Sequence, residues 1–205
     1  MSKIKYFFEQ SWLLITASFC FGLLIAIANA AWSPRIEANR IRKLKNAMQS
    51  LLPQAAAFEQ QDTLNIKTTK GDTFESSLFK GLSDANDCIG WAFQCQGPGF
   101  QDKIELVVAV DENFEAFRGF SVLFSNETPE FGDKIKLPEW RSQFSGAPAE
   151  ELQLVKTGPM DSIDSEIVAI SGATVSSAAV VKLLNNCVQQ VKNEMIHKGL
   201  IRNGN

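Results

Sequence analysis

The hydrophobic pattern of the chain opens with one long uncharged stretch. Residues Leu13–Ala31 read LLITASFCFGLLIAIANAA, and Trp12 and Trp32 flank them. At about 1.5 Å of rise per residue, this stretch is long enough to cross a hydrocarbon layer of roughly 30 Å. The alternative is a cleaved signal peptide with Ala28-Asn29-Ala30 as its cleavage site, but the apolar part exceeds the usual length of roughly 7–15 residues. We therefore predict an uncleaved transmembrane anchor over residues 1–33.

A second helix, amphipathic, is expected over residues 34–53. Apolar side chains recur there at helical spacing, and basic side chains fill the opposite side. The apolar stripe consists of Ile41, Leu44, Met48, Leu51 and Leu52, and Pro53 ends the pattern. The basic side either touches anionic lipid headgroups or is simply solvated, and the pattern does not choose between them.

Alternation of apolar and polar positions predicts a run of strands in the middle of the chain. The candidates are Leu64–Thr69, Thr73–Phe79, Cys88–Cys95, Ile104–Val110 and Ala116–Phe124. The first two are separated by Lys70-Gly71-Asp72, which is typical of a hairpin turn. In the third, alternation places Ile89, Trp91 and Phe93 on one face.

Helical spacing returns near the end of the chain. We expect a short helix over Pro138–Gly146 and a long one from Thr174 to about Ile196. The long helix should bury the side chains that share its apolar stripe, namely Ala178, Val181, Leu184, Val188 and Val191. A helix, a run of strands and a helix predict an α+β fold, an antiparallel sheet with flanking helices, over residues 54–205.

Composition excludes several classes of function. The formal net charge of the 205 residues is −3, which gives no reason to expect a nucleic-acid partner. His197 is the single histidine, so a histidine-based catalytic triad or a histidine-rich metal site is not expected. We predict no catalytic residue and no metal site in this chain.

The four cysteines show neither a C-x-x-C pair nor zinc-ligand spacing. Cys20 lies in the apolar stretch and Cys187 in the long helical pattern, so both are interpreted as packing residues. Cys88 and Cys95 lie closer together, but their odd separation on one strand points them to opposite faces. A disulfide between them would need a bulge or a bend, and this pairing stays open.

Two loops and one helix start are candidates for chemistry. The loops are Gln96–Phe100 and Asn126–Lys134; read alone, the first is a tight turn and the second a surface loop. The helix start is SGATVSS, residues Ser171–Ser177. Ser171 or Thr174 can cap the helix there, and its free N–H groups suit a phosphate. Alone, this signal is weak, since most helices with such caps bind nothing.

The order of these segments resembles a known family. Five stretches match it: Leu51-Leu52-Pro53, Gly97–Phe100 with Ile104–Val108, Asn126–Pro129 with Gly132–Ile135, Trp140 with Gln143-Phe144, and Ala169–Thr174. Placed in this order behind one anchor, they resemble the FMN-binding domain of membrane redox complexes. The resemblance is greatest to the G subunits of Rnf-type ion-translocating ferredoxin:NAD oxidoreductases. It is more distant to the C subunits of sodium-pumping NADH:quinone reductases.

The resemblance implies a covalently bound FMN. In the family, the Thr of the S/T-G-A-T motif carries FMN through a phosphoester that a separate flavin transferase makes, and the matching residue is Thr174. The other positions implied as cofactor-binding are Ser171, Gly172 and Ala173 of the same motif and Glu127, Thr128 and Pro129 of the preceding loop. Phe131 and Phe100 are candidate apolar covers. The implied partners are the transferase and other membrane subunits of an Rnf-type complex.

The chain departs from the family pattern at three places. Glu130-Phe131 stands where the family has Gly-Leu, Val168 where it usually has Asp, and Ser125 where a His is common. These positions bear on recognition by the transferase and on contacts to the flavin. They leave the acceptor hydroxyl of Thr174 unchanged.

Charge and resemblance disagree about orientation. Two lysines precede the span, whereas five basic residues follow it: Arg35, Arg40, Arg42, Lys43 and Lys45. By the positive-inside rule, the C-terminal domain would lie in the cytoplasm. The resemblance instead implies a single-pass protein of the cytoplasmic membrane with its flavin domain on the periplasmic side. We follow the resemblance, because partner subunits can override charge counts.

Three functions are compared. The first is a membrane-anchored electron-transfer subunit with FMN on Thr174. The second is a cofactor-free anchored binding or assembly module, in which SGATVSS is only a helix cap. The third, a free-standing flavoprotein reductase, ranks last, because the sequence has no nicotinamide fingerprint and no candidate acid/base pair. We expect the first.

Overall fold

The computed structural model describes residues 3–160 and 162–201. The chain divides into two compact units, Met1–Lys43 and Leu44–Asn205, each treated by itself below. Helix α1, Lys3–Leu51, supplies the first unit and the beginning of the second. The predicted division at residues 33 and 53 stays a prediction.

Helix α1 contains the predicted anchor. Among the described residues, one helix is long and apolar enough to cross a membrane by length and composition, and its apolar window is not buried in protein. The helix expected to start at Pro34 is instead continuous with the anchor, because Pro34 lies inside α1. Proline removes one N–H donor, and a helix with many remaining hydrogen bonds can continue through it at that cost.

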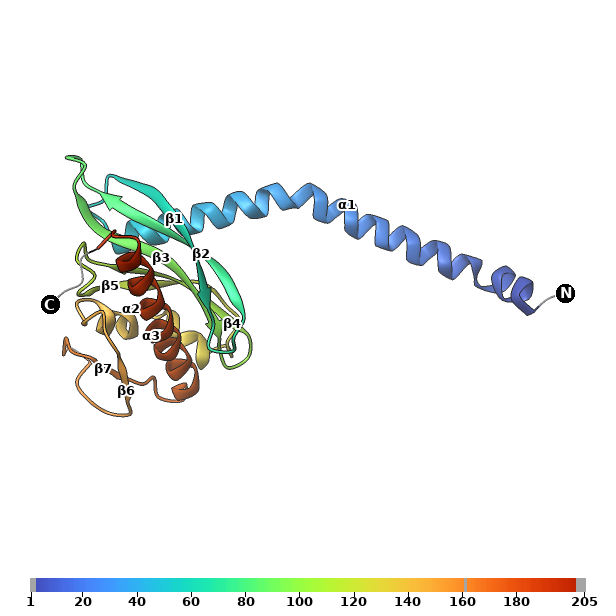
Figure 1. Cartoon of the computed structure of the whole chain (residues 1–205). Helices are drawn as coiled ribbons and strands as arrows, with labels where there is room; N and C mark the ends of the chain where they lie inside the picture. Colours follow the sequence, from blue (N-terminus) through green and yellow to red (C-terminus); the bar gives the residue numbers. More distant parts are fainter. Residues whose placement is uncertain (1–2, 161, 202–205) are drawn as a thin grey trace. The chain divides into compact units, whose positions relative to one another are not determined.

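The second unit is built on a five-stranded antiparallel sheet. Its strands are β1 Ala57–Lys67, β2 Thr73–Leu82, β3 Cys88–Pro98, β4 Lys103–Val110 and β5 Phe117–Ser125. They follow one another in the order β1-β2-β3-β4-β5, so each pairs with its neighbour in sequence (Figure 1). The predicted antiparallel sheet and the α+β class are confirmed.

The segment between the sheet and the last helix contains only short elements. It contains the 3-10 helix η1 Gly132–Lys136, α2 Pro138–Arg141, η2 Ser142–Phe144, strands β6 Gln153–Val155 and β7 Glu166–Val168, and α3 Thr174–His197. The short helix expected over Pro138–Gly146 is thus divided between α2 and η2. The parallel pair β6–β7 was not predicted, since three residues are too few to show alternation.

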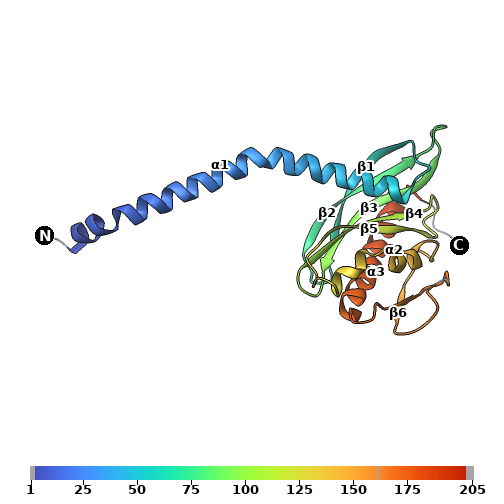
Figure 2. The same ribbon diagram turned by 180° about the vertical axis from the view of Figure 1, so that it is seen from behind.

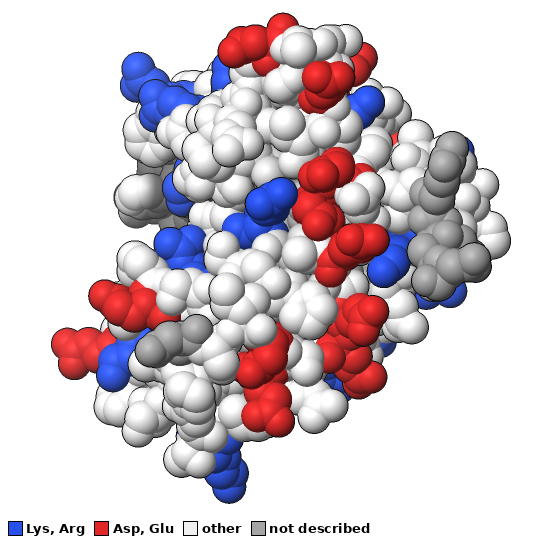
Figure 3. Space-filling view, turned by 90° about the vertical axis from the view of Figure 1, so that its left-hand side faces the viewer, with Lys and Arg blue, Asp and Glu red and all other residues white. Residues whose placement is uncertain are grey.

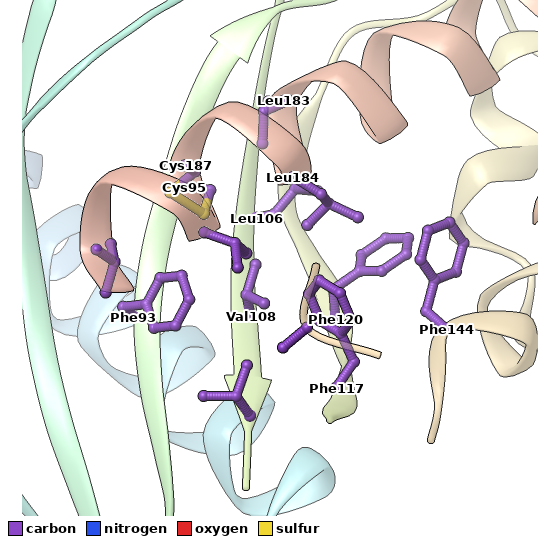
Figure 4. Packing of buried hydrophobic residues seen from close by; sticks show 14 of the residues in the cluster. Phe93, Cys95, Leu106, Val108, Phe117, Phe120, Phe144, Leu183, Leu184 and Cys187 are labelled. Carbon is purple, nitrogen blue, oxygen red and sulfur yellow. A yellow bond between two sulfur atoms is a disulfide. The ribbon is translucent and has the colours of Figure 1, made fainter. Parts of the chain in front are cut away.

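Helix α3 covers one face of the sheet, and the last turns of α1 cover the other (Figures 1 and 2). On the α3 side, Leu106 and Val108 of β4 point toward Leu183 and Leu184 (Figure 4). On the opposite side, Ala47, Met48 and Leu52 pack against Ala92, Val107 and Ala109. Strand β4 therefore lies between two apolar layers.

Two side chains lie away from their predicted faces. Ile89 packs in the α1-side cluster, whereas Trp91 and Phe93 lie in the α3-side cluster. The register shifts between Gly81 and Leu82, opposite this part of β3, and such a bulge reverses the alternation. On α3, Ala178 is exposed, and Ser177 is buried beside it.

A disulfide joins β3 to α3; it corrects the interpretation of Cys187 as a packing residue and answers the open question of the Cys88–Cys95 pair. Cys95 is bonded to Cys187, with 5.9 Å between their Cα atoms (Figure 4). Cys187 is therefore not merely a packing residue, and Cys95 does not pair with Cys88, which is free. The two partners are 92 residues apart, and their proximity depends on where α3 crosses the sheet.

Candidate functional site

The loop before α3 is formed by small residues against an aromatic ring. Ser171 and Gly172 are exposed, whereas Ala173 is buried. Gly172 has φ of +79°, a left-handed conformation that glycine adopts without strain. A Cβ at this position would lie 3.5 Å from the Phe131 ring, so the loop that carries Phe131 lies against the S-G-A-T motif of residues 171–174.

The helix starts without a side-chain cap. The N-cap residue is Ala173, and no side chain bonds the first turn from that position, so the predicted capping by Ser171 or Thr174 is wrong. Instead, Ser177 ties the loop to the helix from inside. Its hydroxyl oxygen accepts the N–H of Ile170 at 3.1 Å, and its O–H donates to the carbonyl of Ala173 at 3.0 Å.

The structure sorts the four hydroxyls of SGATVSS into two kinds. Ser176 and Ser177 are buried and hydrogen-bonded within the protein. Ser171 and Thr174 are exposed, and within the described residues their hydroxyls have no hydrogen-bond partner. Thr174 is the first residue of α3, so its hydroxyl stands in solvent at the helix end.

The helix end around Thr174 has unused donors. The backbone N–H groups of Thr174, Val175 and Ser176 have no acceptor among the residues described. The first turn also contains no acidic residue. Free N–H groups at the positive end of a helix dipole favour an anion there.

A buried carboxylate lies behind this first turn. Glu127 is only 5% exposed, and each of its oxygens accepts hydrogen bonds. Oε1 accepts the backbone N–H groups of Phe100 at 2.8 Å and Gln101 at 3.2 Å, and Oε2 accepts the hydroxyl of Ser176 at 2.5 Å. Glu127 thus connects the β3–β4 turn, the loop after β5 and α3.

Two glycines leave room for this carboxylate. A Cβ at Gly99 would lie 2.3 Å from Oε1 of Glu127, and a Cβ at Gly132 would lie 2.7 Å from Oγ of Ser176. Both distances are shorter than any ordinary carbon–oxygen contact. These glycines therefore serve close packing around Glu127, and neither has a left-handed φ.

The other residues predicted in this loop are less closely connected to the S-G-A-T motif. The carbonyl of Thr128 accepts the N–H groups of Phe131 and Asp133, which closes the loop on itself. Thr128 is half-buried and Pro129 exposed, and in the described part of the chain their side chains make no hydrogen bond to residues 171–174. Phe131 is 55% exposed and Phe100 61% exposed.

Strand β7, which precedes the S-G-A-T motif, is held by a side chain of α2. The indole N–H of Trp140 donates to the carbonyl of Val168 at 2.9 Å. The Trp140 ring meets those of Phe120 and Phe144 edge to face, which holds the indole in place. Like the contact between Glu127 and Ser176, this one joins segments far apart in the sequence, and sequence reasoning missed both.

Acidic residues are spread over one face of the second unit. Asp and Glu side chains form a broken band on the face shown in Figure 3. In this antiparallel meander, the β2–β3 turn with Asp84 and Asp87 and the β4–β5 turn with Asp111 and Glu112 share one end. The β3–β4 turn, which Glu127 joins to the start of α3, lies at the opposite end. The four acidic residues of these two turns therefore lie at the opposite end of the sheet from the turn that Glu127 joins to α3.

Two grooves open beside these elements. The smaller, of about 310 Å³, lies between the β1–β2 and β3–β4 turns and is lined by Gly99 and Phe100. The larger, of about 740 Å³, runs along α3 from Ala178 to Lys192. Thr174 lines neither groove, and it stands exposed beyond the end of the second.

Comparisons with a family model and with individual proteins agree on the family of this chain. Residues 99–189 match the FMN-binding domain, a range that includes the β3–β4 turn, Glu127 and most of α3. The chain is 29% identical over 178 residues to the G subunit of the ion-translocating oxidoreductase complex of Methanosarcina acetivorans, covering 87% of this chain and 90% of that protein. It is 31% identical over 136 residues to the G subunit of the proton-translocating ferredoxin:NAD(+) oxidoreductase complex of Clostridium ljungdahlii, covering 64% and 71%.

The fold is also found among solved structures. NqrC of Shewanella oneidensis superposes with a TM-score of 0.57 at 24% identity, over 71% of this chain and 73% of that one. The C subunit of the Na(+)-translocating NADH-quinone reductase of Parabacteroides distasonis gives a TM-score of 0.52 at 18% identity, over 71% and 80%. At these identities, the likeness concerns the fold.

Proposed function

This chain belongs to the FMN-binding domain family, and on that premise we propose that it is a membrane-anchored electron-transfer subunit with FMN on Thr174. FMN is joined through a phosphoester to the threonine hydroxyl. The protein works within an Rnf-type ion-translocating ferredoxin:NAD oxidoreductase, as the names of its relatives suggest. Its partners are the other membrane subunits of that complex and the flavin transferase that loads it.

The exposed hydroxyl of Thr174 carries this proposal. It is accessible at the first position of α3, beside three backbone N–H groups without acceptors among the described residues. A phosphodiester on this oxygen has two further oxygens, and these N–H groups can bind them. Gly172 and Ala173 add little bulk on the approach to the hydroxyl. The residues present therefore fit a phosphate group.

The attachment chemistry requires a second enzyme. A threonine alcohol is a weak nucleophile, and the nearby Glu127 carboxylate is buried and already accepts three hydrogen bonds. The transferase supplies the base that takes the proton. Oγ1 of Thr174 then forms a bond to the FMN phosphorus of FAD, the pyrophosphate P–O bond breaks, and AMP leaves. When bound, FMN supplies the electron-carrying chemistry that this chain's side chains lack.

Two exposed aromatic side chains are suited to cover a ring. Phe131 rests against Gly172 of the attachment stretch. The backbone N–H of Phe100 donates to Oε1 of Glu127, and Oε2 of Glu127 accepts the hydroxyl of Ser176 in α3. Exposed aromatic surface beside Gly172 favours a planar apolar ligand there. In this proposal, Thr128 and Pro129 lie on the same side of the flavin as Phe131. Ser171 lies at the edge of this binding surface.

The disulfide supports the periplasmic placement of the flavin domain. Disulfides persist in oxidising compartments and are rare in the cytoplasm, so the Cys95–Cys187 bond favours the extracytoplasmic side. It weighs against the cytoplasmic placement that the basic residues after the anchor suggest. A reporter that is active only outside the cytoplasm, fused to the C-terminus, should be active. Activity of a cytoplasm-only reporter at the same position would reverse the assignment.

The test is covalent loading of the full chain. Co-expressed with a flavin transferase, the wild type should give a fluorescent band under denaturing conditions. Its peptide containing Thr174 should gain the mass of FMN less one water. Thr174→Ala should abolish both signals, whereas Ser171→Ala, the other exposed hydroxyl, should keep them. A Thr174→Ala variant that still loads would refute the attachment site, and a wild type that never loads would favour a cofactor-free module.

A further inference from the structure

We propose that Glu127 and Ser176 form a latch that positions Thr174 for flavin transfer, an inference that rests on the proposed function. The latch is the hydrogen bond from the Ser176 hydroxyl to Oε2 of Glu127, at 2.5 Å between two buried side chains. Glu127 is thereby a positioning residue and does not contact the flavin. This role differs from the cofactor contact that the resemblance implies.

The first argument is that the carboxylate of Glu127 is fully engaged. One oxygen accepts two backbone N–H groups of the β3–β4 turn, and the other accepts the Ser176 hydroxyl. With 5% of the residue exposed, little of it remains for a ligand. A phosphodiester would also repel a carboxylate that faced it. The bonds observed hold protein segments together instead.

The second argument concerns the direction of the threonine side chain. Successive residues of an α-helix are rotated by about 100°, so residues two apart point to nearly opposite sides. Ser176 points inward, because its hydroxyl reaches the buried Glu127. Thr174 is two residues earlier and is exposed. Fixing the rotation of the first turn through Ser176 therefore fixes Thr174 outward.

The third argument is that, in the described residues, the start of α3 has no side-chain N-cap and no acidic residue of its own. A carboxylate near a helix N-terminus stabilises it through the helix dipole. Glu127 supplies this charge from the loop after β5, 49 residues earlier in the chain. Without it, the first turn would be expected to fray.

The fourth argument is that the backbone packs closely around Glu127 and Ser176. Side-chain atoms at Gly132 would overlap Ser176, and those at Gly99 would overlap Glu127. The turn and the loop therefore approach the carboxylate as closely as backbone can. Such packing holds the backbone of the first turn, and with it the Cα of Thr174, in one position, and transfer reactions depend strongly on position.

The test is single-turnover transfer from FAD to the flavin-free full chain in detergent, catalysed by a purified flavin transferase. Ser176→Ala and Glu127→Gln should each lower the maximal transfer rate by about tenfold or more, since small misplacements are costly. The chain concentration that gives half the maximal rate should change by less than about twofold, because the docking surface is intact. The double variant should lose no more than the worse single variant, since both act through one bond.

A matched control separates positioning from general stability. Ser76 is also a fully buried serine, and its hydroxyl donates to the carbonyl of Gln94 at 2.7 Å, within the sheet. Ser76→Ala should lower the unfolding midpoint about as much as Ser176→Ala while leaving the transfer rate unchanged. Hydrogen exchange should quicken in residues 170–178 of the Ser176→Ala variant and stay unchanged in β4. If Ser76→Ala and Ser176→Ala lowered the transfer rate equally, the effect of Ser176 would come from stability alone, and the positioning role would be refuted.

The outcomes also separate this inference from the proposed function. If Thr174→Ala is loaded as well as the wild type, the attachment site itself is wrong. If Thr174→Ala is not loaded but folded Ser176→Ala and Glu127→Gln are loaded at the wild-type rate, only the latch is refuted. Glu127→Gln keeps the shape of the side chain, so it tests the latch even if larger truncations fail to fold.

Discussion

Gln143 grips the backbone of Val168 in the way that a neighbouring strand would. The N–H of Val168 donates to Oε1 of Gln143 at 2.8 Å, and Nε2 of Gln143 donates back to the carbonyl of Val168 at 3.4 Å. Trp140 donates to the same carbonyl. These bonds use the backbone of residue 168, so they do not depend on its side chain. The valine side chain at this position therefore plays no part in this anchoring.

Replacing Gln143 should loosen the segment that leads to Thr174. Gln143→Leu keeps the approximate size but leaves the N–H of Val168 without its acceptor, and the free energy of unfolding should fall by about 1–3 kcal/mol. Trp140→Phe, which removes one donor but keeps a ring against Phe120 and Phe144, should cost less. Urea unfolding of the full chain measures both. Stability of Gln143→Leu equal to that of the wild type would show that the grip contributes nothing.

The sequence predicted the sheet well because its signal is local. Alternation over Ile104–Val110 places Ile104, Leu106, Val108 and Val110 in the α3-side cluster, as expected. The same rule failed at Ile89, because a bulge adds a residue that no alternation count can see. Helical spacing failed at Ala178, which is exposed, whereas the adjacent Ser177 is buried and held by hydrogen bonds.

The segments of the candidate site could be identified from the sequence, but the contacts between them could not be predicted. The motif around Thr174 and the loop around Glu127 were recognisable as short strings, and the structure brings them together. The bond between Glu127 and Ser176 spans 49 residues, and the disulfide spans 92. Contacts of this kind depend on how helix and sheet cross, which has no signature in a single sequence.

A salt bridge between the end of α3 and β1 should appear in the titration of Asp62. The hydrogen bond from the Lys198 ammonium, and then that from the Thr63 N–H, lower the pKa of the Asp62 carboxyl below its ordinary value of 3.8. A lowered folded-state pKa stabilises the fold above pH 3.8, and this contribution is lost as the pH falls through the folded pKa. NMR titration should show the lowered pKa, and Lys198→Gln should raise it toward 3.8. An unchanged Asp62 pKa in that variant would exclude the salt bridge.

The disulfide should be the strongest single constraint on α3. Closing a loop of 92 residues lowers the entropy of the unfolded chain, which corresponds to about 4–5 kcal/mol in the loop-entropy account. The variant with both Cys95→Ala and Cys187→Ala should lose stability on this scale, whereas Cys88→Ala should lose far less. Thiol labelling provides a direct check. Unfolded protein should label at Cys20 and Cys88 without reductant and at all four cysteines after reduction. Four labelled cysteines before reduction would exclude the bond.

The close packing of Gly132 against Ser176 gives the last prediction. Gly132→Ala places a Cβ 2.7 Å from Oγ of Ser176 and 2.9 Å from Cβ of Glu127, so neighbouring groups must shift. Overpacking of this kind costs about 1–3 kcal/mol. Ser176→Ala removes the nearest of these atoms, so the cost of Gly132→Ala should be smaller in that background, and a double-mutant cycle measures the difference. Gly158→Ala is the control, because the nearest atom to its Cβ is a Val168 methyl at 3.3 Å. Additive effects of Gly132→Ala and Ser176→Ala would show that the two residues do not touch in solution.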